Sequence, residues 1–142
     1  MLRENQVATR ATFQFYRQTS RPFPTQREQA PIPTVRWRLI AGNRRELGRS
    51  AELFADVTAG ETHVEELVAG LEMLSVRVLI EPVAARWTWE VHLDGRSLAS
   101  SSRSYARRIE CLLSVQQFLR LVPQARVDPT LRVFSVDRRG RR

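Results

Sequence analysis

The apolar residues of this chain recur at a fixed offset, and this internal repeat limits the folds open to it more than any other feature. Between residues 47 and 71 the apolar positions return 51 residues later, so that Leu47 matches Leu98. In the preceding segment the offset is 52, which matches Trp37 with Trp89. Because the matched positions follow both the strand period and the helix period, the sequence predicts two copies of one strand–hairpin–helix unit.

Alternating patterns predict the strands of each copy. Residues 35–40 and 87–93 alternate apolar and polar side chains, as strands with one buried face do. Further strands are predicted at 11–16, 46–49, 76–80 and 131–136. The dipeptide Asp94-Gly95 predicts a type I′ hairpin turn, because both of its residues tolerate positive φ.

One helix is predicted in each copy. The first begins at a capping box, Thr58 to Glu61, in which each side chain satisfies a backbone N–H of the other. The second is expected to run from about Ser104, its N-cap, to Val122, because Pro123 then stops it. The predicted fold class is α+β, with two tandem copies of a small antiparallel β-sheet plus a helix related by a pseudo-two-fold axis.

The repeat also sets the expected domain boundaries. The first copy is assigned to residues 11–72 and the second to 73–137. Within the first copy, residues 20–34 contain four prolines, which predicts an extended loop without helix or central strand. Residues 1–10 are expected to form a flexible N-terminus and residues 138–142 a basic tail.

The second copy carries a pattern that is known from one protein family. A strand led by Trp89 is followed by the turn Asp94-Gly95, a returning strand with small residues, Tyr105 and a helix. In this order of features each copy resembles the YegP-like domain of unknown function. The resemblance covers about residues 75–137 and extends to 11–72. It implies tandem sheets covered by helices, and it implies no catalytic residue and no ligand, because the function of the family is not established.

Charge is segregated along the chain. The 142 residues carry a net charge of +8, and all 23 basic residues are arginine. Residues 1–50 have a net charge of +7, residues 51–100 of −6 and residues 101–142 of +7. Arginine presents a planar fork that suits phosphate and carboxylate groups, so a polyanion or an acidic protein is the expected partner.

Membrane association is not expected. No apolar run approaches the roughly 18 residues that a membrane-spanning helix needs. The first twenty residues lack the apolar core of a signal peptide, so a cytoplasmic location is expected.

The start of the second predicted helix breaks a rule that the first obeys. Glu52 and Asp56 precede the first helix, whereas Arg103 and Arg107 occupy the matched positions before the second. Helix N-termini carry partial positive charge and favour acidic side chains. We therefore expect an anion- or partner-binding site made of Ser101, Ser102, Arg103, Ser104, Arg107 and Arg108. The alternative is a solvated surface turn with Ser104 as the N-cap.

A second basic cluster lies in the first predicted hairpin. Arg44, Arg45 and Arg49 surround its turn and are added to the candidate anion-binding residues. Alone, such a cluster is also what a charged, solvated loop looks like. The terminal run Arg138 to Arg142 could add non-specific attraction to phosphate, or could serve only as a solubilising tail.

No catalytic or metal-binding constellation stands out. His63 lies beside an acidic helix face and His92 on the polar side of a strand, and neither has a second ligand at the spacing a metal site requires. Cys111 belongs to the apolar stripe of the second helix, where a thiol is usually inert. The chain is therefore expected not to be an enzyme and to need no cofactor.

These features predict a small non-enzymatic binding module that contacts nucleic acid or a ribonucleoprotein through its arginine clusters. The alternative is a protein–protein adaptor that uses its charge-segregated surface, and a small-anion sensor or enzyme ranks third. The acidic face of the first helix, with Glu61, Glu65, Glu66 and Glu72, also permits head-to-tail contacts between copies. Polyanion binding weakens log-linearly with salt, whereas an apolar protein interface depends on salt far less.

Overall fold

In the part of the chain that the structure describes, one mixed sheet and two α-helices form the fold. The computed structural model describes residues 10–18 and 33–133. The strands are β1 (Thr12–Arg17), β2 (Val35–Ile40), β3 (Glu46–Ser50), β4 (Ser75–Glu81), β5 (Arg86–Leu93), β6 (Arg96–Ser101) and β7 (Arg126–Val133). The α-helices are α2 (Val57–Ala69) and α3 (Arg108–Leu121), followed by the 3-10 turns η1 (Leu71–Met73) and η2 (Val122–Gln124). The predicted α+β class is confirmed.

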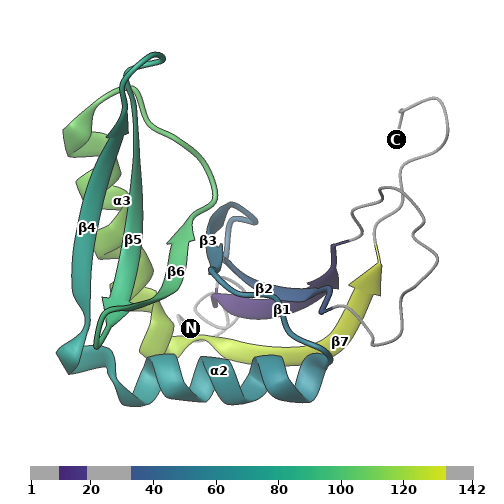
Figure 1. Cartoon of the computed structure of the whole chain (residues 1–142). Coiled ribbons are helices and arrows are strands. Elements are labelled where there is room, and N and C mark those ends of the chain that lie inside the picture. The colour runs from purple at the N-terminus through teal and green to yellow at the C-terminus, as the bar shows by residue number, and fades with distance from the viewer. Residues whose placement is uncertain (1–9, 19–32, 134–142) are drawn as a thin grey trace, which may run out of the picture.

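The sheet joins the two halves of the chain at its centre. Its strand order is β4-β5-β6-β3-β2-β1-β7. β3 and β6 therefore pair at the centre, with β2 and β1 on one side of this pair and β5 and β4 on the other. Neighbouring strands are antiparallel except β1 and β7, which are parallel. In Figure 1 the strongly twisted sheet has α3 beside β4 and β5, and α2 running beneath β7. β7 therefore adds a seventh strand to the outer edge of the first half.

The core is a single cluster to which both halves contribute. Trp37 and Trp89 are both fully buried, as their alternating strands predict. Phe118 of α3 stacks on Trp37 at a centroid distance of 6.4 Å and packs against Trp89 at 4.8 Å. Because one helix residue contacts both tryptophans, the two halves share one hydrophobic core instead of forming two separate domains.

The same backbone contacts recur in the two halves. The backbone N–H of Trp37 donates to the Ser50 hydroxyl at 3.3 Å, and that of Trp89 donates to the Ser101 hydroxyl at 3.2 Å. The serines are 51 residues apart and the tryptophans 52, which are the offsets of the sequence repeat. Each buried serine therefore ties a returning strand to the aromatic strand beside it.

The indole N–H groups of the two tryptophans also have matched acceptors. Trp37 Nε1 donates to His63 Nδ1 at 2.9 Å, and Trp89 Nε1 donates to the Ser114 hydroxyl at 3.0 Å. His63 lies on α2 and Ser114 on α3, again 51 residues apart. Both helices are thus fixed to the sheet by a hydrogen bond to a fully buried tryptophan.

Both helices begin at other residues than predicted. Asp56 is the N-cap of α2 and accepts from the N–H of Ala59 at 2.9 Å, so the prediction of Thr58 as the N-cap is wrong. The N-cap of α3 is Arg107, so the prediction of a helix beginning at Ser104 is also wrong. The later start of α3 follows from Tyr105, whose backbone exchanges two hydrogen bonds with Trp87 and is held extended.

Other local predictions have mixed outcomes. The Asp94-Gly95 turn is confirmed, because both residues have positive φ, 53° and 81°. The last strand starts at Arg126, five residues before the predicted 131–136, and it passes through Pro129 at an irregularity in its pairing with β1. The predicted loop lies almost wholly outside the described residues, as do both predicted flexible ends. In the described part of the chain no helix is long and apolar enough to cross a membrane.

Candidate anion-binding site

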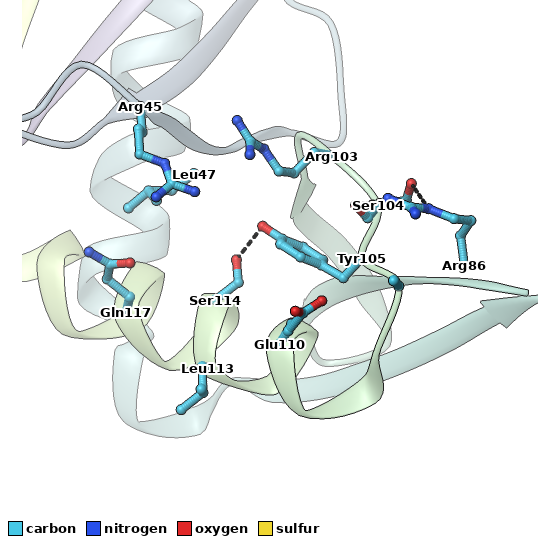
Figure 2. A pocket seen from close by; sticks show the side chains of 11 residues that line it. Arg45, Leu47, Arg86, Arg103, Ser104, Tyr105, Glu110, Leu113, Ser114 and Gln117 are labelled. Atoms are coloured by element: carbon cyan, nitrogen blue, oxygen red, sulfur yellow. Dashed lines mark hydrogen bonds between the residues drawn. The ribbon is translucent and has the colours of Figure 1, made fainter.

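A pocket of about 480 Å³ opens beside α3 in the second half. Its walls come from four places: the residues just before and within β3, the start of β5, the loop between β6 and α3, and one face of α3. The lining residues are Arg45, Leu47, Arg86, Arg103, Ser104, Tyr105, Ala106, Glu110, Leu113, Ser114 and Gln117. Figure 2 shows Arg45 and Arg103 on the same side of this pocket, across from α3. Three predicted site residues therefore meet here, namely Arg45, Arg103 and Ser104.

The matched place in the first half is closed by ion pairs. Arg96 contacts Glu66 through two hydrogen bonds of 2.7 and 3.1 Å, and contacts Glu52 at 2.9 Å. The hydrogen bond from Arg96 lowers the pKa of Glu66, and the two carboxylates raise the pKa of Arg96. Such a bidentate pair neutralises a guanidinium within the protein itself.

Three residues of the pocket occupy positions that match Arg96, Glu52 and Glu66 but carry different charges. Arg45 corresponds to Arg96, Arg103 to Glu52 and Gln117 to Glu66, each pair being 51 residues apart. Within residues 10–18 and 33–133, neither Arg45 nor Arg103 has a carboxylate within ion-pairing distance. At these three positions the pocket therefore holds two guanidinium groups, whereas the matched cluster holds one guanidinium and two carboxylates.

Hydrogen bonds fix the floor and the rim of the pocket. Arg86 donates to the hydroxyl of Ser104 at 3.0 Å and to its carbonyl oxygen at 2.8 Å. The Tyr105 hydroxyl lies 2.8 Å from the Ser114 hydroxyl, which also accepts from an indole N–H of the core. Figure 2 shows the Tyr105–Ser114 pair between the two free arginines and α3. The polar groups of the floor are therefore held in place before any ligand binds.

Glu110 is the acidic member of the lining. Its carboxylate accepts from the backbone N–H of Arg107 at 3.3 Å, which satisfies a donor at the start of α3. The helix thus obtains its cap from Glu110, and the side chain at the N-cap position itself is basic. Glu110 leaves the pocket with a positive balance, because Arg45, Arg86 and Arg103 also line it.

Several predicted site residues lie outside the pocket. Arg107 is exposed at the start of α3, and Arg108 places its guanidinium 6.0 Å from the centre of the Trp87 ring. Ser101 is buried with its hydroxyl bonded inside the sheet, which corrects its assignment to the binding cluster. Ser102 donates to Glu46 at 2.6 Å and so faces a neighbouring carboxylate.

The hairpin cluster is divided between two surfaces. Arg44 adopts a left-handed conformation in its turn, with φ of 70°, and lines a second pocket on the other side of β2. Arg49 lies half-buried within β3, opposite Arg38 of β2. Of this cluster only Arg45 reaches the pocket beside α3.

Sequence reasoning missed Arg86, Tyr105 and Gln117 as pocket residues. The signal that could have found Gln117 was present, because the offset of 51 relates it to Glu66 just as it relates Arg103 to Glu52. Arg86 carries no such signal, since its position depends on how the turn before β5 meets the loop before α3.

The described chain has an α+β fold with a basic pocket beside α3. No protein-family model and no curated protein match the chain. The solution structure of a protein of unknown function, yegP from E. coli, is similar, with 14% identity, a TM-score of 0.59, and coverage of 89% of this chain and 97% of that one. A UPF0339 protein from Shewanella oneidensis is similar with 10% identity, a TM-score of 0.54, and coverage of 85% and 90%. At these identities the likeness establishes the fold alone.

Proposed function

We propose that this protein is a small non-enzymatic binding module of the cytoplasm that takes up phosphate groups of a nucleic acid or a ribonucleoprotein. The pocket beside α3 is its anchoring site, with Arg45 and Arg103 as the principal contacts. The exposed Arg107 and Arg108 extend the basic surface along the start of α3.

The observation that carries this proposal is the charge difference between matched places. The charge of Arg96 is neutralised within the protein by Glu52 and Glu66, with all donor–acceptor distances at or below 3.1 Å. In the pocket, Arg45 and Arg103 repel each other, and neither forms an ion pair with a carboxylate of the described residues, so an anionic ligand would supply the missing counter-charge. A phosphate group supplies that charge with a geometry that suits guanidinium forks.

The module is expected to read the backbone of the nucleic acid and not its bases. Base recognition by stacking needs exposed aromatic faces. Trp37 and Trp89 are fully buried, and Trp87 is covered in part by Arg108. Contacts to phosphate position a nucleic acid without reading its sequence, so we expect little sequence preference.

We also propose that the two halves are copies of one unit related by a pseudo-two-fold axis. The paired tryptophan–serine contacts, the paired indole acceptors and the strand order support this relationship. The second copy has then exchanged two carboxylates, at positions 103 and 117, for a guanidinium and an amide.

A salt series on nuclease-treated protein tests the proposed function. Binding of a fluorescein-labelled single-stranded RNA is measured by anisotropy at several salt concentrations. The logarithm of the affinity should fall linearly with the logarithm of the salt concentration, because bound counterions are released. Substituting Arg45→Gln should reduce the slope by about one unit and should weaken all RNA sequences alike. An absence of RNA binding, with capture of an acidic protein instead, would contradict the proposal and favour the adaptor alternative.

A further inference from the structure

The outer edge of β4 lacks the protection that edge strands usually have. None of its seven residues is buried, and Val76, Leu79 and Ile80 are 39%, 38% and 47% exposed. Val83, in the turn that follows, is 91% exposed. A row of unpaired backbone groups beside exposed apolar side chains is a template for another strand.

The other edge of the sheet is protected. β7 carries Pro129, which cannot donate a backbone hydrogen bond, and the charged residues Arg126, Asp128 and Arg132. Proline and charge are the usual means by which a sheet edge resists pairing. β4 has no proline, and its only charged residues are Arg77 and Glu81.

The strand that corresponds to β4 in the first half is already covered. β1 pairs with β2 as β4 pairs with β5, so that Phe15 lies opposite Trp37 and Val78 lies opposite Trp89. β7 lies along the outer edge of β1, and Phe15 is fully buried. The corresponding edge of β4 has no covering strand in the described part of the chain.

We propose that β4 pairs with β4 of a second copy of this chain, antiparallel about a two-fold axis at Leu79. In this register Arg77 lies opposite Glu81 of the second copy, and Glu81 lies opposite its Arg77. Directly opposed charges of opposite sign stabilise a strand pair. Ile80 lies opposite the partly buried Val78 on the other face, and Leu79 lies opposite Leu79 of the second copy, so the exposed Leu79 and Ile80 both gain apolar contacts.

The sequence of β4 favours a second copy over a different protein. A two-fold contact requires a strand that is complementary to itself, and a residue pair of opposite charge placed symmetrically about Leu79 meets that condition. The contact occupies the one unprotected sheet edge that the described residues of each copy contain. Pairing therefore stops at the dimer instead of continuing into a fibre.

Sedimentation velocity of the full chain tests the dimer over a range of about 1 μM to 1 mM. We expect the wild type to pass from monomer to dimer with concentration. Leu79→Lys places two like charges at the axis and should leave a monomer with unchanged circular dichroism. The matched control is Val127→Lys, because Val127 is 42% exposed on the opposite edge strand. This control should dimerise like the wild type.

Charge reversal tests the register. Arg77→Glu alone and Glu81→Arg alone each create like-charge pairs and should each weaken the dimer. An equimolar mixture of the two variants restores both opposite-charge pairs and should form heterodimers. A wild type that stays monomeric at the highest concentration would overturn the proposal, and so would a Leu79→Lys variant that dimerises as the wild type does. Failure of the mixture to recover dimers would overturn the register. RNA binding is measured separately, so these outcomes leave the pocket proposal unaffected.

Discussion

At the scale of single residues, the two indole acceptors differ in one chemical property. His63 and Ser114 occupy matched positions and both accept from a buried tryptophan, but only His63 titrates. Because Trp37 donates to Nδ1, the histidine must carry its proton on Nε2 when it is neutral. Protonation would place a hydrogen on Nδ1 as well, and the acceptor for Trp37 would be lost.

Burial lowers the pKa of His63 below its usual value of 6.5, although Glu52, with its nearest oxygen 3.7 Å from Nε2, raises it in part. The unfolded chain therefore binds a proton at this residue before the folded chain does. We predict that the free energy of unfolding is highest above about pH 6.5 and falls as the pH drops below that value. The slope from one proton cannot exceed about 1.4 kcal/mol per pH unit.

Urea denaturation between about pH 7.5 and pH 5.5 measures this effect. His63→Ser replaces the imidazole with a hydroxyl, the group with which Ser114 of α3 accepts from Trp89. This variant should show a smaller fall in the free energy of unfolding over this pH range. His92→Gln is the control, because it keeps His63. Its free energy of unfolding should fall with decreasing pH as that of the wild type does. A His63→Ser variant that loses stability as steeply as the wild type would show that other groups are responsible.

At the scale of elements, the two α-helices begin with different caps. Asp56 caps α2 through its own carboxylate, whereas Arg107 at the same place on α3 relies on Glu110 three residues later. A basic side chain at a helix N-terminus costs roughly 0.3–1 kcal/mol. An anionic partner that contacts Arg107 would offset this cost.

We predict that Arg107→Asp raises the free energy of unfolding by about 1 kcal/mol, because it gives α3 both a side-chain cap and a favourable charge. Chemical denaturation monitored by tryptophan fluorescence measures the change. The paired variant Asp56→Ala should lower the free energy of unfolding by about the same amount. If Arg107→Asp instead destabilises the protein, then Arg107 stabilises the fold and is not retained for a partner.

The order of strands and helices could be predicted from the sequence because alternation and helical spacing are local. Trp37 and Trp89 were expected in the core, and both are there. The start of α3 could not be predicted, since Tyr105 is held extended by a backbone contact with Trp87 of β5. A contact of this kind overrides the local preference for helix.

The pocket was only partly predictable for a related reason. Arg103 was found because its counterpart Glu52 has the opposite charge at a matched position. The role of Arg45 needed the geometry, because it depends on the ion pairs that its counterpart Arg96 makes with Glu66 of α2 and with Glu52 in the loop before α2. Ser101 was misplaced because a serine in a polar run looks the same whether its hydroxyl faces solvent or the sheet.

At the scale of the whole molecule, the two halves have different surfaces on a shared core. Beside α2 the surface is closed by the cluster of Glu52, Glu66 and Arg96, the last contributed by β6 of the second half, and the outer strand of the first half is covered by β7. The second half keeps an open basic pocket and a bare outer strand. The pocket beside α3, to which the first half contributes Arg45, and the bare edge of β4 are therefore the surfaces on which the two proposals rest.

The most direct test compares the affinity for single-stranded RNA of two variants with the same change in net charge. Arg103→Glu reverses a pocket residue, and Arg126→Glu reverses an exposed arginine at the start of β7 that does not line the pocket. At fixed salt, Arg103→Glu should weaken binding by about tenfold or more, and Arg126→Glu by clearly less. Equal losses in the two variants would mean that only net charge attracts the RNA, and they would contradict a specific role of the pocket.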